Sequence, residues 1–402
     1  MHSASKRAQV LVVGAGPVGA FAAYRLARMG IDTILIEALP NCPEDMRAST
    51  FHPPSIEMLD ALELSEALIA DGLKAPVYQY RDRRSGQTIE LDMTELSEVT
   101  PHPYRLQCEQ YKLARLASAR LDAHPCGTAL FSHRLLAFEQ DDTGVTVQVE
   151  TPMAVEQIRC DYMIGADGAN STVRKWTGIG FNGFTWPESF LTLSTAYPIE
   201  QHIKGLANVN YVADATEWCV LLRVPTLWRM LVPAPGGTGI DYLSDAYKSG
   251  VFDRLVGDGK AVETYHRTLY RVHQRVAETF RQGRVLLAGD AAHLNNPLGG
   301  FGMNSGLHDA WNLTGKLEQI LIGGEPADPL LDRFDRQRRT ISHEFIQSQT
   351  IQNKEAMEST DVDGRSLQES KLRALLDDKE ARMRHLLAQG MFTSLRREAE
   401  IA

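Results

Sequence analysis

The chain has 402 residues, of which 43% are hydrophobic and 23% charged, values typical of a globular protein with a sizeable core. Its net charge of -9 argues against nucleic acid or an anionic membrane as the main partner. No apolar run approaches the roughly 20 residues that a membrane-spanning helix needs.

The N-terminal segment and the cysteines indicate a cytoplasmic protein. Residues 1–9 are polar, and the apolar run after them is a strand that enters a glycine turn, so we expect no signal peptide. The cysteines lie far apart, without a CxxC pair, and are expected to be reduced thiols: Cys42, Cys108, Cys126, Cys160 and Cys219. No pair of histidines has a ligand spacing near a cysteine or carboxylate cluster, so no metal site is expected.

The first predicted unit is a strand, a glycine turn, a helix and a second strand within about 30 residues. Residues 10–13 are an apolar run typical of a buried parallel strand. The turn Gly14-Ala15-Gly16-Pro17-Val18-Gly19 follows, and residues 20–29 carry the apolar stripe of a helix. Residues 33–36 then form a strand that ends at Glu37. This order of elements is typical of a dinucleotide-binding fold.

Each glycine of the turn has a physical reason. Gly14 makes the tight turn, Gly16 leaves room for a phosphate, and Gly19 lets the helix pack closely on the strand. The start of the helix offers free N–H groups and a favourable dipole to a pyrophosphate. Glu37 lies at the strand end, where its carboxylate can accept a hydrogen bond from a ribose hydroxyl. The turn and the acid predict NAD or FAD and argue against NADP.

The next segments contain a cationic candidate and a hairpin. Arg47 lies ten residues after the acid and is a candidate donor to pyrophosphate oxygens. Helices are predicted over residues 54–62 and 111–121. Residues 144–149 alternate apolar and polar side chains, as a half-buried strand does, and are predicted to pair with residues 135–139.

A second glycine motif follows, and after it the sequence changes from a pattern of strands and helices to one of short strands. Residues 162–174 are predicted to form a strand, a tight turn with Asp167, and a helix capped by Asn170 or Ser171. From residue 182 to residue 279, short β-like runs recur between prolines and glycines. This pattern predicts an antiparallel sheet inserted into the dinucleotide domain.

The third motif is RVLLAGDAAHLNNPLGGFGMN, at residues 284–304. A buried strand delivers Asp290 at its C-terminal end, where ligands gather in open α/β sheets and a carboxylate can accept from a polyol hydroxyl. The loop at residues 297–302 lets backbone approach a flat ring closely, and Met303 and Asn304 offer backbone N–H groups at the start of a helix. Further helices are predicted over residues 307–322, 328–354 and from 363 onward. The three motifs together fit a flavin dinucleotide.

In their order and spacing, the three motifs resemble the class A flavoprotein monooxygenases, the family of para-hydroxybenzoate hydroxylase, over roughly residues 8–350. The resemblance implies an α/β fold with a Rossmann-like FAD-binding domain, an inserted antiparallel-sheet substrate domain and C-terminal helices. The implied FAD-binding domain is discontinuous and covers residues 1–75, 100–180 and 280–330. The substrate domain covers residues 76–99 and 181–279, and the C-terminal helical region covers residues 331–402.

The resemblance also assigns cofactor-binding residues by position. The residues assigned to binding the ADP half of FAD are Gly14, Gly16, Pro17, Gly19, Glu37 and Arg47. The remaining cofactor-binding candidates are Gln110 (with Gln107 as its alternative), Leu135, Asp167, Asp290, Gly302, Met303 and Asn304. Among these, Asp290 would bind the ribitol, and the second motif would also serve the nicotinamide cofactor. The catalytic candidates of the loop beside the isoalloxazine are Pro297, Gly299 and Gly300.

The reaction implied by the resemblance uses NADH or NADPH together with oxygen. The nicotinamide reduces the flavin, oxygen adds at flavin C4a, and the hydroperoxide passes one oxygen atom to an electron-rich phenolic or heteroaromatic ring. The protein must exclude water and position the ring. The implied partners are therefore a small aromatic substrate and oxygen, and a homodimer is a further hypothesis.

The inserted sheet is expected to line the substrate pocket. Its candidate residues are Tyr197, His202, Tyr211, Trp218, Arg223 and Trp228. Arg223 would pair with a substrate carboxylate, and His202 or Tyr211 would move a phenolic proton. His52 is a candidate to lie over the flavin ring, whereas His293, beside the ribitol aspartate, is expected to point away from it.

Two other classes of protein stay open. The first is a halogenase or epoxidase on the same scaffold that acts on a natural product, although the Trp-x-Trp-x-Ile-Pro signature of halogenases is absent from the nearest run, residues 227–233. The second is a redox sensor that holds FAD without turnover, against which the three intact motifs argue. NADH oxidation with oxygen uptake distinguishes turnover from binding alone.

Overall fold

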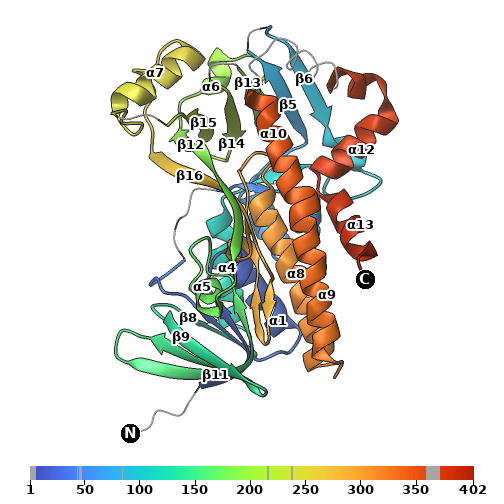
Figure 1. Cartoon of the computed structure of the whole chain (residues 1–402). Helices are drawn as coiled ribbons and strands as arrows, with labels where there is room; N and C mark the ends of the chain where they lie inside the picture. The colour runs from blue at the N-terminus through green and yellow to red at the C-terminus, as the bar shows by residue number, and fades with distance from the viewer. Residues whose placement is uncertain are drawn as a thin grey trace.

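The structure, a computed structural model, describes residues 6–42, 44, 48–83, 85–214, 217–236, 239–358 and 372–402. Figure 1 shows two β-sheets, one above the other, with long helices along one side of both. The lower sheet is mainly parallel and is called the parallel sheet below. The upper one is called the antiparallel sheet. The predicted α/β class with an inserted antiparallel sheet is confirmed.

The parallel sheet is built around the first motif. Its strand order is β17-β18-β11-β1-β2-β8, and β1 pairs in parallel with both β2 and β11. The bounds are β1 (Lys6–Val13), β2 (Thr33–Ile36), β8 (Gly127–Leu130), β11 (Val155–Gly165), β17 (Arg281–Gln282) and β18 (Val285–Leu287). The predicted hairpin is confirmed as β9 (Arg134–Asp141) and β10 (Gly144–Glu150), which extends the sheet beyond β11.

Helices cover the parallel sheet because its strands are buried runs with no polar face. The helices that pack together there are α1 (Pro17–Arg28), α4 (Gln110–Asp122) and α8 (Phe301–Leu321). The first predicted helix begins three residues earlier than expected, since Pro17 has the backbone angle of a first helical turn and lacks an N–H that would need a partner. Shorter helices are α2 (Pro53–Asp60), α3 (Ser65–Ala70) and α5 (Thr172–Thr177).

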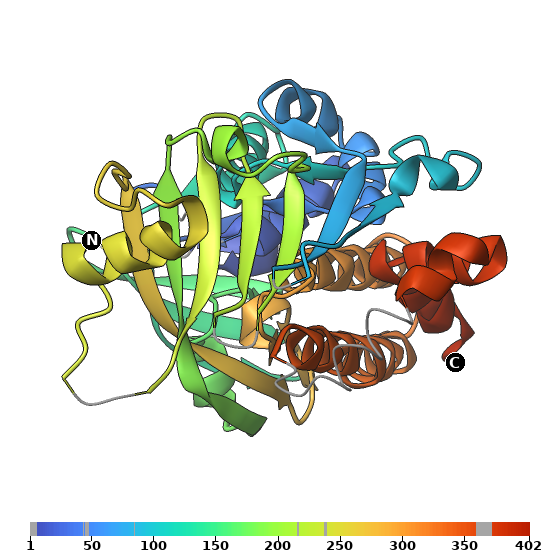
Figure 2. The same cartoon turned by 90° about the horizontal axis from the view of Figure 1, so that it is seen from above.

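The antiparallel sheet has the strand order β19-β16-β12-β15-β14-β13-β5-β6. The bounds are β5 (Val77–Asp82), β6 (Thr88–Asp92), β12 (Phe181–Thr195), β13 (Val209–Ala213), β14 (Cys219–Arg223), β15 (Trp228–Ala234), β16 (His266–Ala277) and β19 (His293–Leu294). Strands β12 and β16 are long and reach from this sheet down beside the parallel sheet (Figure 1). In Figure 2 the sheet is seen from above; α7 (Asp245–Val256) packs on one face of it, against residues of β12, β14 and β15.

A small third sheet, β3-β7-β4, brings the β3 and β7 segments close to the third motif. Its strands are β3 (Thr50–Phe51), β4 (Leu73–Ala75) and β7 (Arg105–Gln107). Asn304 of α8 donates to the Thr50 carbonyl at 2.8 Å, and Arg105 of β7 reaches β13 of the antiparallel sheet. This sheet therefore contacts both of the larger units.

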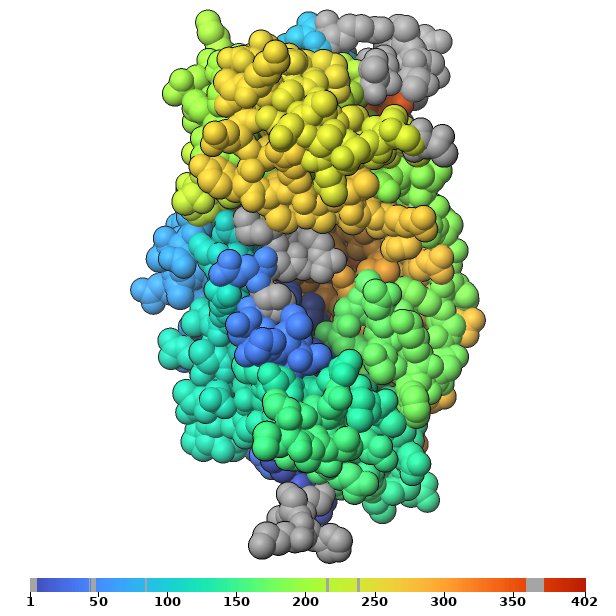
Figure 3. Space-filling model, turned by 90° about the vertical axis from the view of Figure 1, so that its left-hand side faces the viewer, coloured from blue at the N-terminus to red at the C-terminus, as the bar shows by residue number. Residues whose placement is uncertain are grey.

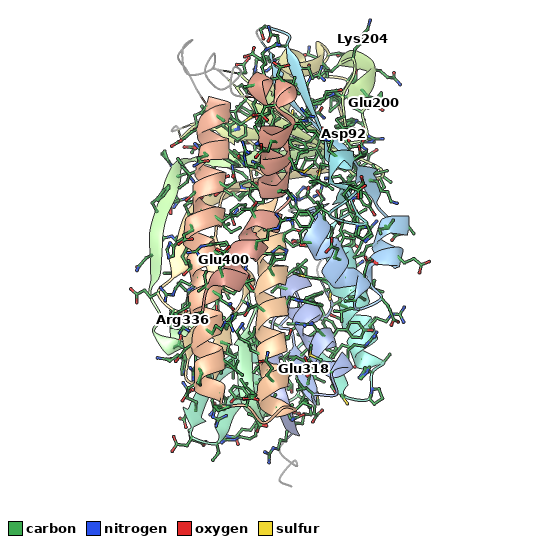
Figure 4. The ribbon with its side chains drawn as sticks, turned by 90° about the vertical axis from the view of Figure 1, so that its right-hand side faces the viewer. Asp92, Glu200, Lys204, Glu318, Arg336 and Glu400 are labelled. Carbon is green, nitrogen blue, oxygen red and sulfur yellow. The ribbon has the colours of Figure 1, made fainter. Side chains whose placement is uncertain are left out.

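The C-terminal helices run along both sheets. They are α9 (Ala327–Ile341), the π-helical turn η3 (Ser342–Gln347), α10 (Ser348–Glu358), α12 (Lys379–Gln389) and α13 (Phe392–Glu400). The predicted helix over residues 328–354 is thus longer and contains a π-helical turn, and the first residues of the predicted tail, 363–371, lie outside the described residues. Figure 4 shows Glu318, Arg336 and Glu400 on α8, α9 and α13 respectively. None of the helices in the described ranges is long and apolar enough to cross a bilayer.

A buried histidine between α2 and α8 predicts a loss of stability in acid. His308 is 1% exposed and its Nε2 lies 3.1 Å from the Ser55 hydroxyl. Burial, with the nearby charge of Arg338, lowers the pKa of His308 from 6.5 to about 3. The unfolded chain takes up this proton near pH 6.5 and the folded chain does not. The stabilisation is therefore complete above that pH and is lost as the pH falls toward 3.

We expect His308→Gln to reduce the pH dependence of the free energy of unfolding by roughly 1.4 kcal/mol per pH unit between those values. The measurement is urea unfolding at a series of pH values. The control is His202→Gln, which removes an exposed histidine from α6 (Ile199–His202). An equal change of slope in both variants would contradict the prediction.

Candidate active site

A cleft of about 630 Å³ lies between the parallel and antiparallel sheets. Its volume falls within the roughly 300–1,000 Å³ typical of ligand sites. All three sequence motifs contribute to its walls, together with strands of the antiparallel sheet. Figure 3 shows the surface hollowed at mid-height, between the blue N-terminal segment and the green and orange segments.

The three glycines of the first motif differ in what surrounds them. Gly14 has a φ of 103°, and a Cβ there would lie 2.5 Å from the Ala166 carbonyl oxygen. A Cβ on Gly19 would lie 2.0 Å from the Gly14 carbonyl oxygen, so α1 packs on the turn with no space for a methyl group. A Cβ on Gly16 would meet nothing within 4 Å, and this residue lines the cleft beside Pro17.

Glu37 lies at the end of β2 and faces the cleft. Its two carboxylate oxygens accept from the backbone N–H groups of Ala15 at 2.8 Å and Leu39 at 3.0 Å. These bonds hold the carboxylate beside the glycine turn. A carboxylate has about four acceptor positions, so the two bonds leave capacity for a ribose hydroxyl. Arg47 lies outside the described residues.

The second motif supplies a fixed carboxylate and a helix cap. One oxygen of Asp167 accepts from the N–H groups of Thr172 at 2.7 Å and Val173 at 3.1 Å, at the start of α5. Of the two predicted caps, Ser171 is the one that accepts, from the Arg174 N–H at 2.9 Å. The other Asp167 oxygen, Oδ1, is buried without a hydrogen-bond partner among the described residues, and Asp167 lines the cleft.

Asp290 of the third motif stands on the cleft wall in the turn η2 (Gly289–Ala291), held by a buried carboxylate behind it. Asp309 accepts from the Gly289 N–H at 3.0 Å, lies 2.8 Å from His293 Nε2 and pairs with Arg338 Nε at 2.6 Å. Burial would raise the pKa of Asp309, but the charges of His293 and Arg338 outweigh it and lower the pKa. His293 points away from the cleft, as expected.

Buried side chains hold the glycine-rich loop at residues 297–302, before α8, by hydrogen bonds. Asn304 is fully buried: its side-chain oxygen accepts from the His52 N–H at 2.9 Å, and its amide donates to the Gly300 carbonyl at 2.7 Å. His52 Nε2 lies 2.8 Å from the Gly299 carbonyl, and its ring stacks on Phe301. His52 therefore lies behind the loop and does not line the cleft. Burial lowers the pKa of His52 well below 6.5, so it is neutral at physiological pH.

Most of the remaining cofactor candidates line the cleft, either on this loop or next to it. Those that line the cleft are Pro297, Gly299, Gly300, Gly302, Met303, Gln110 and Leu135. Gln107, the alternative to Gln110, is fully buried and accepts from the Thr50 hydroxyl at 3.0 Å. Gln110 is thus the glutamine with access to a ligand.

The substrate candidates divide according to the pleat of the antiparallel sheet. Tyr211 of β13 lines the cleft, as predicted. On β14, Val220 and Leu222 face the cleft, so Arg223 faces the opposite side, where its guanidinium lies over the Trp228 ring. The prediction that Arg223 meets a substrate was therefore wrong.

Other substrate candidates also lie away from the cleft. His202 is exposed on α6, and its Nε2 lies 2.8 Å from the Tyr197 hydroxyl. Trp228 packs on the far face of the sheet. Trp218 packs against Phe190 in the same apolar cluster as Tyr211, Val220 and Leu298, but it does not itself line the cleft. The proposed roles of His202, Tyr197 and Trp228 at the substrate are withdrawn because these side chains lie away from the cleft, and that of Trp218 is withdrawn because its neighbours cover it.

The sequence reasoning missed two buried arginines on the cleft wall, Arg105 of β7 and Arg229 of β15. Arg229 interrupts an otherwise apolar strand, which was a signal that could have been used. Arg105 carried no comparable signal, because its neighbours in the fold come from distant strands. The apolar lining of the same part of the cleft comes from Val220 and Leu222 of β14, Leu231 of β15 and Leu298 of the glycine-rich loop.

Comparison with known proteins agrees with this geometry. The profile of the family described as FAD binding domain matches residues 7–349. Para-nitrophenol 4-monooxygenase of Pseudomonas sp. strain WBC-3 is 32% identical over 361 residues, which are 88% of this chain and 88% of that protein. The 6-hydroxy-3-succinoylpyridine 3-monooxygenase of Pseudomonas putida strain S16 is 30% identical over 354 residues, 87% of this chain and 88% of that protein.

A solved structure extends the comparison to the fold. The crystal structure of p-nitrophenol 4-monooxygenase from Pseudomonas putida DLL-E4 matches with a TM-score of 0.90 and 29% identity, over 98% of this chain and 99% of that one. The fold and the cleft define a flavin-dependent oxygenase. The chain belongs to the class A flavoprotein monooxygenases that carry this FAD-binding domain, and the predicted resemblance is confirmed. It is an FAD- and NAD(P)H-dependent aromatic monooxygenase.

Proposed function

We propose that this enzyme hydroxylates a compound with one aromatic ring, a phenol or a hydroxypyridine. The observation that carries the proposal is the apolar chamber between the antiparallel sheet and the glycine-rich loop. Val220, Leu222 and Leu231 form one wall, Leu298 lies on the loop, and the Tyr211 hydroxyl supplies a polar group. The two relatives named above, by their names, act on para-nitrophenol and on 6-hydroxy-3-succinoylpyridine, each with one ring and one hydroxyl.

We further propose how the cleft residues hold FAD. The turn Gly14–Gly19 with Pro17 and the start of α1 would hold the pyrophosphate, and Glu37 a ribose hydroxyl. Asp290 would hold the ribitol, and Asp167 has one oxygen left to accept from the cofactor. The isoalloxazine would lie against Pro297–Met303, with Gln110 and Leu135 along its length. The fit is supported by the open space at Gly16 and by the carboxylates of Glu37, Asp167 and Asp290, which line the cleft shortly after β2, β11 and β18 end.

The flavin, when bound, supplies the redox and oxygen chemistry. The chain's own tasks are to exclude water and to orient the ring. The apolar side chains of the chamber serve the first task. Tyr211 serves the second: its hydroxyl accepts from Arg105 Nη1 at 3.1 Å, so its own proton can be donated to an oxygen on the ring.

The test is oxidation of NADH and NADPH by the flavin-loaded protein with nitrophenols, hydroxypyridines and hydroxybenzoates, with oxygen uptake and product mass measured in parallel. Oxidation stimulated by one ring, with a mass gain of one oxygen atom, is the expected result. FAD retention without ring-dependent turnover would contradict the proposal. It would favour a larger natural-product substrate or a sensor that does not turn over.

Replacing Asp290 by alanine is expected to remove most of the FAD from the purified protein, because its carboxylate is the proposed acceptor for the ribitol. The measurement is the ratio of flavin to protein absorbance after desalting. Asp290→Asn is the matched variant, which keeps the size of the side chain and an acceptor oxygen, and should retain more FAD. Flavin content equal to that of the unchanged protein in Asp290→Ala would contradict the assignment.

We also propose that the enzyme works in the cytoplasm and as a homodimer. Five free cysteines, four of them buried, support the reducing compartment. Sedimentation of the flavin-loaded protein tests the dimer, and a monomer at micromolar concentration would contradict it.

A further inference from the structure

Arg105 is a buried cation on the wall of the cleft. It belongs to β7, is 1% exposed and is among the largest fully buried side chains. Its guanidinium lies 4.3 Å from the centre of the Tyr78 ring, and its Nη1 donates to the Tyr211 hydroxyl at 3.1 Å. Tyr211 in turn stacks on Tyr80. The arginine is therefore held in place by aromatic rings.

Two donors of this guanidinium lack a partner. Nε and Nη2 are buried and make no hydrogen bond within the described residues, and no carboxylate of those residues pairs with Arg105. An arginine buried in this way normally pairs with an anion, because an uncompensated charge is costly to desolvate. Arg338 illustrates the usual arrangement, since it is paired with Asp309 and Glu398.

The charges along the cleft are unevenly distributed. The half formed by the parallel sheet is lined by the carboxylates Glu37, Asp167 and Asp290 and by Arg134, whose guanidinium pairs with Glu150. The half formed by the antiparallel sheet and β7 is lined by cations: Arg105, Arg229 and Arg271. Among the described residues of this second half, none is a carboxylate. The local field therefore favours a negatively charged group in the substrate chamber.

We propose that Arg105, oriented by the Tyr211 hydroxyl, binds a negatively charged oxygen of the aromatic substrate, so that the ring is taken up as an anion. The inference rests on the proposed function, because it specifies the charge of that substrate. A planar guanidinium with two unmet donors suits an oxygen anion, which can accept from both. The anion is either the ionised ring hydroxyl or a carboxylate elsewhere on the ring.

The experiment measures binding to the FAD-loaded enzyme, without NAD(P)H, from the change that a ligand causes in the flavin absorbance. Three probes share one ring: 4-nitrophenol, at a pH at which it is ionised; 4-methoxybenzoate, which carries a carboxylate and no hydroxyl; and 4-nitroanisole, which carries no ionised group. The variant is Arg105→Gln. The matched control is Arg223→Gln, an arginine on the opposite face of the antiparallel sheet.

We expect the unchanged enzyme to bind one of the anions at least tenfold more tightly than 4-nitroanisole. Arg105→Gln should lower the affinity for that anion by roughly 10- to 100-fold, the loss expected for hydrogen bonds to a charged group. The affinity for 4-nitroanisole should change by no more than about twofold. Loss confined to 4-nitrophenol identifies the ring oxygen as the anion, and loss confined to 4-methoxybenzoate identifies the carboxylate. Arg223→Gln should bind all three probes as the unchanged enzyme does.

Equal weakening of all three probes, or unchanged binding of the anions by Arg105→Gln, would overturn the inference. If Arg105→Gln does not fold, Tyr211→Phe and Arg105→Lys decide the question. Each should lower the affinity for the same anion several-fold and leave the affinity for 4-nitroanisole unchanged. The binding experiment needs no turnover. An enzyme that hydroxylates a ring but binds anions independently of Arg105 would overturn this inference alone, whereas absence of ring-dependent turnover would overturn the proposed function.

Discussion

Gly19→Ala is expected to destabilise the protein by roughly 3 kcal/mol or more and to abolish FAD retention. The added methyl group would lie 2.0 Å from the Gly14 carbonyl oxygen and 3.2 Å from the Ala166 Cβ. The first of these contacts is with backbone, which cannot move without displacing α1 from β1. Because the same turn is the proposed pyrophosphate site, loss of the packing and loss of the cofactor should occur together. The measurements are urea unfolding of the flavin-free protein and flavin content after desalting.

Gly16→Ala is the matched control because it separates the two effects. Gly16 has extended backbone angles that any residue adopts, and its methyl group would meet nothing within 4 Å. The flavin-free protein should therefore unfold within about 1 kcal/mol of the unchanged one. FAD should still bind more weakly, because the methyl group would occupy space that the phosphate needs. A Gly19→Ala protein that is as stable as Gly16→Ala would contradict the packing argument.

The second large effect is expected for Arg338→Met, with a loss of about 3–5 kcal/mol in the free energy of unfolding. Arg338 is fully buried, pairs with Asp309 and Glu398, and donates to the Ser305 hydroxyl at 3.1 Å. Methionine would fill part of the space but would leave the Asp309 carboxylate buried without this cation. Because Asp309 also holds the Gly289 N–H, the turn that presents Asp290 should loosen, and FAD affinity should fall.

Arg339→Met provides the comparison from the next position of the same helix. Arg339 pairs with Asp335 at 3.0 Å one turn away, and its side chain is 35% exposed. Half-exposed pairs of this kind contribute about 1 kcal/mol or less, so this variant should unfold almost as the unchanged protein does. Urea unfolding and FAD titration of both variants give the answer. Equal stability of the two would mean that the buried pair contributes nothing beyond an exposed one.

The half of the cleft proposed for FAD was largely predictable because its motifs are local. The need for glycine at position 14 follows from a positive φ in a turn of a few residues, and the position of Glu37 follows from the end of the adjoining strand. The prediction of a single helix over residues 328–354 missed a π-helical turn within it. Such a turn has no pattern of its own in the sequence.

The substrate half was predicted poorly because strand alternation leaves two choices of face. A shift of one residue reverses every side chain, and the sequence of β14 is apolar on both faces. Arg223 was therefore placed at the substrate, although the structure turns Val220 and Leu222 toward the cleft in its place. Gln107 and Gln110 also could not be distinguished from the sequence. Both are glutamines near the start of α4, and only packing decides which of them reaches the cleft.

By itself, the sequence determined the class of protein, the order of the three motifs and most of the cleft residues that we propose to hold the dinucleotide. Each of these depends on backbone geometry within a few neighbouring residues, where glycine, proline and a strand end leave few alternatives. Only the tertiary structure decided which side chains meet in the substrate chamber. Arg105 and Tyr211 are 106 positions apart and come together because β7 pairs with β4, and the chain continues from β4 into β5, which pairs with β13. Contacts of that kind depend on how distant strands pair and pack, which no local pattern encodes.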